Sequence, residues 1–196
     1  MADALTSELD AVNIILGALG EAPVATLIGT LPGDVAVAYR TLTEIRKRIL
    51  MLGWDCNTEK EVQLALNQDG EVVIAPTVLK IELSATGFPG DQEITQRGKR
   101  LYDKKNRTYV FASAPLVDQV VMLGWDELPE QLRIYVALKA ARVFQARTLG
   151  APELAGFTVQ DENEARIAWL DADGDSANYN MLRNPQFASS YQYRRS

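Results

Sequence analysis

Paired carboxylates are the side chains in this sequence whose types and spacing best suit chemistry. Asp126 lies next to Glu127, and one residue separates Glu162 from Glu164. Two carboxylates that stand roughly 5 to 10 Å apart can serve as the acid and the base of a glycosidase. Sequence neighbours do not fix that geometry, and acidic chains hold many such pairs. We therefore assign no catalytic residue and expect a protein that is not an enzyme.

Other catalytic and metal chemistry is limited by missing residue types. Histidine is absent and Cys56 is the single cysteine, so Ser-His-Asp and Cys-His sites cannot form within one chain, and zinc lacks its commonest ligands. Alternating aspartates at residues 171–175 resemble the start of a calcium loop. The glycine, however, is Gly174 rather than the sixth residue, and Leu182 replaces the final glutamate. We expect no metal and no cofactor.

Nucleotide and DNA binding are also disfavoured. The nearest approach to a phosphate-binding loop, Gly98-Lys99-Arg100, lacks the glycine spacing and the terminal hydroxyl of that motif. A net charge of −6 opposes a surface that grips nucleic acid through neutralised phosphates. Contact with passing DNA, without capture, is compatible with this charge.

Length and composition predict a globular protein outside the membrane. The 196 residues, 47% hydrophobic and 23% charged, can bury one sizeable core or a core with a small satellite. The longest apolar stretches, residues 13–19 and 117–125, are shorter than the roughly 20 residues of a membrane span. The acidic N-terminal segment differs from a signal peptide. We expect the chain to be soluble and cytoplasmic when made.

Two helices are predicted before residue 58. Apolar residues recur at steps of three and four over residues 5–19, with Thr6 or Ser7 as the N-cap and Gly20 as the stop. After a turn at residues 32–33, Asp34 can cap the second helix. The apolar stripe of this second helix consists of Ala38, Leu42, Ile45, Ile49 and Leu52.

The residues between the second and third predicted helices favour a small, mostly antiparallel β-insertion, because short runs rich in Val, Ile, Thr and Tyr alternate with turn residues. The predicted strands are residues 62–66, 78–85, 100–103, 108–111 and 116–123. We expect residues 100–103 and 108–111 to form a hairpin around the polar turn at residues 104–107.

Helical periodicity returns after the β-rich region. A long helix over residues 128–149 has apolar residues on two faces, one of which includes Ile134. A further helix over residues 159–172 has an acidic outer surface, with Ile167 and Leu170 predicted to point inward. The fold class is therefore α+β: a bundle of about four helices with an inserted small antiparallel β-domain and an extended C-terminal arm. The predicted domains are residues 1–58 with 126–175, residues 59–125, and the arm at residues 176–196.

Two basic clusters are the main charge features. One lies on the outer face of the second helix, and residues 97–107 hold six Lys or Arg against one Asp. Such clusters are usually solvated or guard an exposed strand edge, although they can also meet an acidic partner. As candidate residues of a subunit or partner interface we select Arg46, Lys47, Lys104, Lys105 and Arg107.

Several short segments occur together, in the same order, in one known family. They are Ala11-Val12-Asn13-Ile14-Ile15-Leu16, residues 20–27, Leu52-Gly53-Trp54-Asp55-Cys56-Asn57, Arg100-Leu101-Tyr102-Asp103, Trp125-Asp126-Glu127-Leu128-Pro129-Glu130, residues 144–152 and Asp161-Glu162-Asn163-Glu164-Ala165-Arg166. Each is a capping, turn or packing signature, and together they span nearly the full length. On these segments the chain resembles tail tubular protein A, the head-to-tail adaptor of short-tailed, podovirus-type phages. The middle β-region matches more loosely.

This resemblance implies a structural virion protein of the phage tail, made in the host cytoplasm. It implies a ring of about twelve copies between the portal protein and the tail nozzle protein, with tail fibres as a further candidate partner. Genome DNA would pass through the lumen during ejection without specific binding, and no membrane is involved. Residues from 178 onward have little reason to fold alone, so we expect this arm to fold onto the portal. Its expected docking residues are Phe187, Tyr191, Tyr193, Arg194 and Arg195.

Two other functions remain as alternatives. A virion-associated glycan hydrolase with a structural role would use carboxylates among Glu130, Asp161, Glu162 and Glu164. A DNA-clamping connector would use the basic clusters and would bind DNA in a strongly salt-dependent manner.

Overall fold

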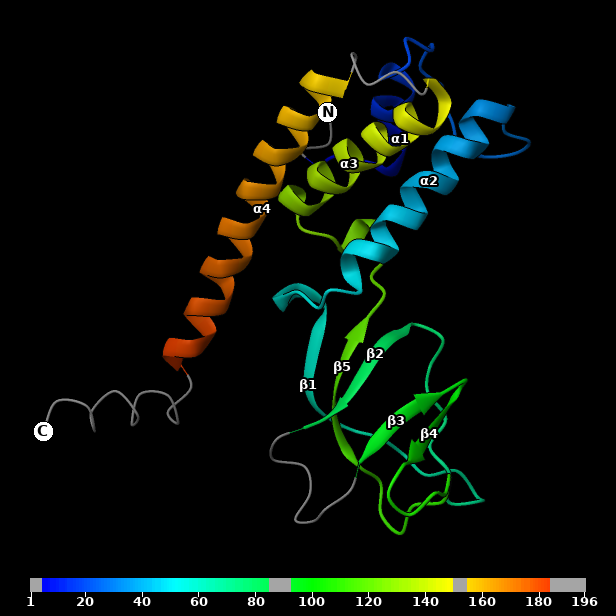
Figure 1. Cartoon of the computed structure of the whole chain (residues 1–196), viewed down its shortest axis with the longest axis vertical. Helices are drawn as coiled ribbons and strands as arrows, with labels where there is room; N and C mark the ends of the chain where they lie inside the picture. Colours follow the sequence, from blue (N-terminus) through cyan, green and yellow to red (C-terminus); the bar gives the residue numbers. More distant parts are fainter. Residues whose placement is uncertain (1–4, 85–92, 150–154, 184–196) are drawn as a thin grey trace, which may run out of the picture. The chain divides into compact units, whose positions relative to one another are not determined.

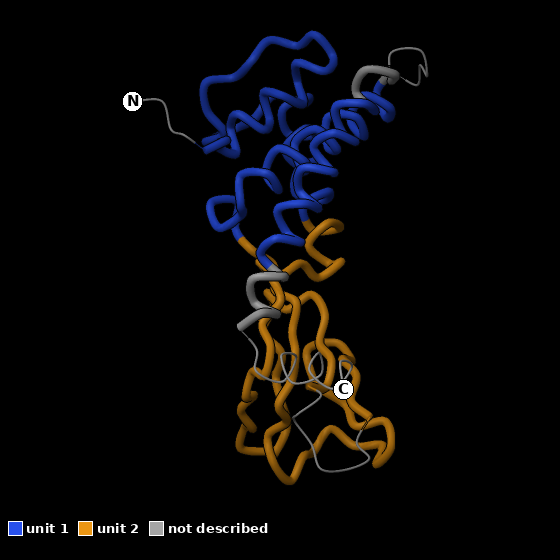
Figure 2. The backbone as a smooth tube through the Cα atoms, turned by 90° about the vertical axis from the view of Figure 1, so that its left-hand side faces the viewer, with its two compact units in different colours: residues 1–46, 124–196 blue, residues 47–123 orange. Residues whose placement is uncertain are grey.

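The computed structural model of the chain describes residues 5–84, 93–149 and 155–183. In this part of the chain, four α-helices and small antiparallel sheets confirm the predicted α+β class (Figure 1). Contacts divide the chain into unit 1, residues 1–46 with 124–196, and unit 2, residues 47–123 (Figure 2). The domain boundaries predicted from the sequence stay a prediction, because compact contacts do not by themselves show independent folding.

Helix α1 spans Glu8–Gly17 in unit 1 and confirms the first predicted helix. Ser7 is its N-cap: the Asp10 N–H donates to the Ser7 hydroxyl at 3.1 Å, and the Ser7 N–H donates to the Asp10 carboxylate at 3.0 Å. This reciprocal capping box satisfies backbone donors that the first helical turn leaves open. Val12 and Leu16 are buried on the inner face of α1.

Helix α2 spans Gly33–Leu50, so it begins one residue before the predicted cap, Asp34. Asp34 therefore lies in the first turn, where its negative charge favours the positive end of the helix dipole. Leu42 and Ile45 are buried as predicted, whereas Leu52 lies beyond the helix end and is 68% exposed.

Helix α3, Glu130–Leu149, packs against both α1 and α4, which agrees with the prediction of a helix buried on two sides. Leu132 and Val136 are buried, but the prediction for Ile134 was wrong because this side chain is 39% exposed. Short 3-10 turns, η1 at Asp55–Asn57 and η2 at Trp125–Glu127, precede β1 and α3 respectively. Trp125 is buried at the second of these turns.

Helix α4 spans Ala155–Arg183, so it extends well beyond the predicted end at residue 172. Residues 176–183, assigned from the sequence to the arm, are helical, since extending an existing helix costs little once it is nucleated. The inward orientation predicted for Ile167 and Leu170 was wrong: they are 57% and 37% exposed, and Trp169 is buried instead. Every helix within the described ranges is too short or too polar to cross a membrane.

Within the described residues of unit 2, five strands form two antiparallel sheets. The larger sheet has the order β1-β5-β2, and the smaller consists of β3 and β4. The strands are β1 (Thr58–Gln63), β2 (Val78–Leu83), β3 (Ile94–Arg97), β4 (Arg100–Asp103) and β5 (Leu116–Val121). Their core is formed by Val72, Ile74, Val78, Leu101 and Phe111.

The predicted hairpin was only partly right. Residues 104–107 do form a turn that brings Thr108 back to Asp103, but only an isolated bridge joins the two. The strand that pairs with β4 is β3, across a tight turn at Gly98 and Lys99. Gly98 has φ +63°, which glycine adopts without steric cost at the first central position of a two-residue hairpin turn.

Replacing Gly98 with alanine is expected to lower the free energy of unfolding by about 1 kcal/mol, because alanine is strained at positive φ. Among the described residues, and apart from the two chain neighbours of Gly98, no atom lies within 4 Å of an added Cβ, so this conformational strain should dominate the effect. Gly174 in α4 is the matched control, since its added Cβ also meets open space. There alanine should stabilise the helix by about 0.5 to 1 kcal/mol. Urea unfolding measures both changes, and equal effects would contradict the turn.

Candidate interaction surfaces

The carboxylates proposed for an alternative glycan hydrolase have structural partners. Glu130, at the start of α3, accepts hydrogen bonds from the backbone N–H of Thr6 at 2.9 Å and from the Thr6 hydroxyl. Glu164 accepts a hydrogen bond from Gln160 one helical turn earlier. Asp161 is exposed on α4. Glu130 therefore helps to hold the fold, whereas the Glu164 bond is an exposed contact within α4 itself.

Glu162 is buried on α4 and joins this helix to α3. Its carboxylate pairs with Lys139 at 3.0 Å and with the guanidinium of Arg142. Burial alone would raise the pKa of Glu162, but hydrogen bonds from Arg142 and Lys139 outweigh it and hold the pKa below its ordinary value. A carboxyl that stays ionised has no proton to give, which is unsuited to the general acid of a glycosidase.

The aspartates at residues 171–175 are part of α4, not of a loop. Residues two positions apart in a helix point to nearly opposite sides, so Asp173 points away from Asp171 and Asp175. The three carboxylates therefore cannot surround one ion. In the residues that the structure describes, no group of three or more His, Cys, Asp or Glu is arranged to hold a metal.

On the β3–β4 hairpin of unit 2 and the segment that follows it, two arginines stack on two tyrosines. The Arg97 guanidinium lies 3.7 Å from the Tyr102 ring centroid, and that of Arg100 lies 4.1 Å from the Tyr109 centroid. The two rings meet edge to face at 4.9 Å. These contacts hold the side chains in fixed positions at the surface, which favours binding because less side-chain entropy is lost.

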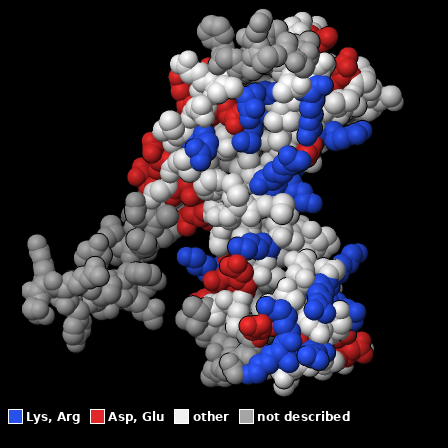
Figure 3. Space-filling view, viewed as in Figure 1, with Lys and Arg blue, Asp and Glu red and all other residues white. Residues whose placement is uncertain are grey.

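The turn that follows β4 presents three of the residues selected from the sequence. Lys104, Lys105 and Arg107 are exposed there. The buried Asp103 shapes the turn by accepting hydrogen bonds from the backbone N–H groups of Asn106 and Lys105, and the Asn106 bond in particular lowers its pKa. Figure 3 shows Lys and Arg gathered over this end of unit 2.

We call the hairpin face the set Arg97, Arg100, Tyr102, Tyr109, Lys104, Lys105 and Arg107. Val73, beside Arg100 in the bridge between strands, adds an apolar side chain that is 59% exposed. The two tyrosines were not among the residues predicted from the sequence, although their positions on either side of a basic turn were a usable signal. Arginine and tyrosine are enriched in protein interfaces.

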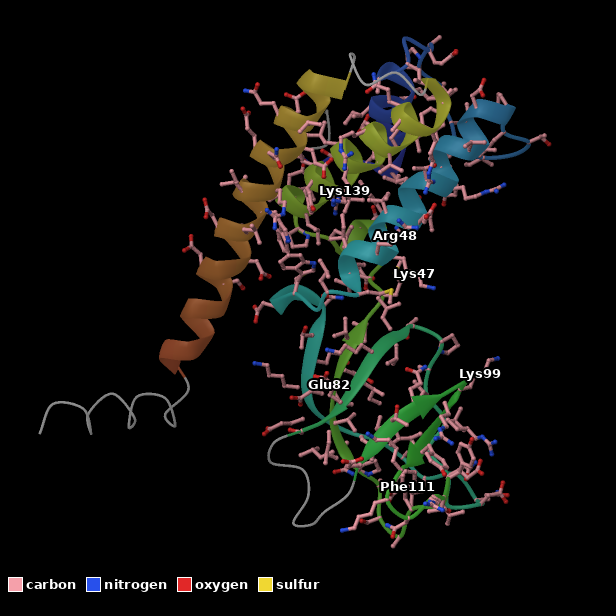
Figure 4. All side chains as sticks on the ribbon, in the orientation of Figure 1. Lys47, Arg48, Glu82, Lys99, Phe111 and Lys139 are labelled. Atoms are coloured by element: carbon pink, nitrogen blue, oxygen red, sulfur yellow. The ribbon has the colours of Figure 1, made fainter. Side chains whose placement is uncertain are left out.

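The two residues selected on α2 have different environments. Arg46 points inward, where it pairs with Glu8 of α1 at 3.3 Å, and its side chain is only 13% exposed. Lys47 is exposed near the C-terminal end of α2, beside Arg48 (Figure 4). The other proposed docking residues, Phe187, Tyr191, Tyr193, Arg194 and Arg195, lie outside the described residues.

Helix α4 has an outer surface with two strips. Val159, Ile167 and Leu170 are 41%, 57% and 37% exposed and follow one line at helical spacing. Beside them runs a second strip of exposed carboxylates. Its members are Asp161, Glu164, Asp171 and Asp175. An apolar strip next to charges is typical of a helix that packs against another protein surface rather than water alone.

Known proteins with similar sequences are components of phage tails, which agrees with a chain that presents several interaction surfaces. A sequence model of the tail tubular protein family matches residues 9–179. The chain is 26% identical to tail tubular protein A of Klebsiella phage KP34 over 185 residues, which cover 93% of this chain and 91% of that relative. The resemblance inferred from the sequence is thereby confirmed. The chain belongs to the tail tubular protein family and is a structural component of a phage tail.

Proposed function

We propose that the protein is a head-to-tail adaptor, which forms a ring of about twelve copies between the portal protein and the tail nozzle protein. The observation that carries this proposal is membership of the tail tubular protein family over residues 9–179. The exposed apolar and charged surfaces of α4 and of the hairpin face support an assembly role. The chain is made in the host cytoplasm and joins the particle there.

In this role the ring lets genome DNA pass during ejection. The net charge of −6 disfavours capture of the phosphate backbone, so the DNA stays mobile in the lumen. The expected result is no retention of the assembled ring on double-stranded DNA at low salt. Retention that weakens steeply as salt rises would instead favour a DNA-clamping connector.

Two groups of residues in the adaptor are assigned to different partners. The C-terminal residues Phe187, Tyr191, Tyr193, Arg194 and Arg195 dock on the portal, because aromatic and arginine side chains anchor interfaces. The hairpin face, including Lys104, Lys105 and Arg107, meets an acidic surface of another tail protein, such as the nozzle or a fibre.

Removal of residues 184–196 tests portal docking while keeping the whole of α4. Full-length chain should join purified portal, and the shortened chain should bind at least about tenfold more weakly, as expected when several anchors are lost. Native mass spectrometry of the mixtures measures this difference. The matched substitutions Arg194→Ala and Arg195→Ala should weaken binding, whereas Lys60→Ala, exposed on β1, should not. Equal binding of the full and shortened chains would contradict the assignment.

A further inference from the structure

Two helices of this chain present exposed charges of opposite sign at the same spacing. On α4, Glu164 and Asp171 are exposed and lie seven residues apart. On α2, Arg40 and Lys47 are exposed and also lie seven residues apart. Seven residues make about two helical turns, or about 10.5 Å along the axis, so each pair lies on one side of its helix.

Both charge pairs lie beside exposed apolar side chains. The α4 pair borders the strip of Val159, Ile167 and Leu170. On α2, Val37 is 46% exposed and lies one turn before Arg40. The α4 strip and Val37 are exposed within the part of the chain that the structure describes, and their burial would be favourable at about 25 cal/mol per Å² of apolar area.

The intervening charge on α2 does not cancel this complementarity. Glu44 lies between Arg40 and Lys47, but its carboxylate is held by both terminal nitrogens of Arg147 on α3, at 3.0 and 3.2 Å. The outer side of α2 is therefore basic and the outer side of α4 acidic. Figure 3 shows Asp and Glu along α4, and Lys and Arg over α2 and α3.

We propose that the outer face of α4 packs on the outer face of α2 in a second copy of this chain, with Glu164 and Asp171 opposite Arg40 and Lys47. The two faces differ, so the contact is heterologous, and a heterologous contact closes into a ring when its rotation permits. This inference rests on the proposed ring and names its subunit interface. The acidic α4 face could also meet the basic hairpin face of a second copy. The α2 face suits it better, because Arg100 of the hairpin face already pairs with Glu71 at 2.7 Å.

A charge-exchange experiment tests the interface. The acidic-face variant carries Glu164→Lys and Asp171→Lys, and the basic-face variant carries Arg40→Glu and Lys47→Glu. Each variant alone opposes like charges at every subunit contact, and its half-assembly concentration should rise at least about tenfold. A mixture of the two places Lys opposite Glu at one contact and the original pairs at the next. Equimolar mixing should therefore restore rings in which the two variants alternate.

Native mass spectrometry distinguishes the outcomes, because the two variants differ in mass. The matched control, Glu59→Lys with Glu82→Lys on exposed strand positions, changes net charge by the same amount as the acidic-face variant and should assemble like the wild type. Either variant alone forming rings at the wild-type half-assembly concentration would overturn the interface and leave the ring itself intact. So would a mixture of folded variants that forms no rings at that concentration. If a reversal variant loses its wild-type unfolding midpoint, Glu164→Gln with Asp171→Asn should still weaken assembly, and unchanged assembly would overturn the interface. Absence of wild-type rings, alone and with portal, would overturn the proposed function as well.

Discussion

Replacing Arg133 with methionine should lower the free energy of unfolding by about 3 kcal/mol. Arg133 lies on α3, is 3% exposed, and donates to three backbone carbonyls: Thr6 at 3.1 Å, Asp126 at 2.8 Å and Leu128 at 2.9 Å. The Thr6 carbonyl also accepts from the Trp125 indole at 2.9 Å. Methionine would therefore leave the Asp126 and Leu128 carbonyls without the Arg133 donor. The cost is about 1 to 3 kcal/mol for the buried Leu128 acceptor and less for the partly buried Asp126 acceptor.

Two further variants test whether stability depends on the planar guanidinium of Arg133. Arg133→Lys keeps the charge but has no planar guanidinium to span carbonyls in different directions, so it should recover at most part of the loss. Arg166→Met removes an exposed arginine on α4 and should change stability by no more than about 0.5 kcal/mol. Urea unfolding followed by circular dichroism measures all three. An Arg133→Met midpoint equal to that of the wild type would contradict the role assigned to this side chain.

Replacing Glu162 with alanine should lower the free energy of unfolding by about 3 kcal/mol, because it leaves Lys139 and Arg142 without their shared carboxylate. The side chains of both cations are about one-third exposed, at 29% and 33%, so water offsets part of the cost. Glu164→Ala on the exposed side of α4 is the control and should cost no more than about 0.5 kcal/mol.

A triple replacement separates two quantities: the stability that the ion cluster contributes, and the penalty of leaving its two cations without their carboxylate. Changing Glu162 to leucine and both Lys139 and Arg142 to methionine removes every charge of the cluster and keeps apolar volume between α3 and α4. This variant should return to within about 1 kcal/mol of the wild type, since a well-packed apolar contact replaces a buried ion pair at little cost. A triple variant as unstable as Glu162→Ala would show that the charges themselves hold α4 in place.

The ion cluster of Glu162, Lys139 and Arg142 also makes the free energy of unfolding depend on pH. The pKa of Glu162 is lower in the folded chain than in the unfolded chain, where it is about 4.3. The contribution of the carboxylate is thus complete above about pH 4.3 and is lost as pH falls through the folded-state pKa. The difference in unfolding free energy between wild type and Glu162→Ala should be constant near neutral pH and shrink below about pH 4.3. A difference that persists at lower pH would contradict this assignment.

Local signals in the sequence determined much of the fold. The cap at Ser7 and the apolar steps of α1 need only neighbouring residues, and both are visible in the sequence. The segment at residues 52–57 is also visible in the sequence, since it marks the end of α2. Its physical role, however, needs the fold: buried Asn57 donates to the Leu50 carbonyl at 3.0 Å and to the Val121 carbonyl at 2.8 Å.

The incorrect predictions concern two features that local sequence does not reveal: which strands pair, and which charged side chains form buried ion pairs. The pairing of β3 with β4 depended on Gly98, whereas the polar turn at residues 104–107 offered an equally good local signal. On α4, apolar character favoured Ile167 and Leu170 as the inward side chains. The ion pairs of Glu162 and the buried ring of Trp169 instead determine which side faces α3, and they leave the apolar strip exposed. A pattern of hydrophobicity alone cannot distinguish a core face from an interface face.

Cryo-electron microscopy of the intact phage particle tests the central proposal most directly. The adaptor function predicts a closed ring of about twelve copies of this chain between portal and nozzle, with residues 184–196 against the portal. The proposed subunit interface also predicts the α4 face of each copy against α2 of the next. Density for this chain elsewhere in the particle, or in an arrangement without a closed ring at the head-to-tail junction, would contradict the adaptor function.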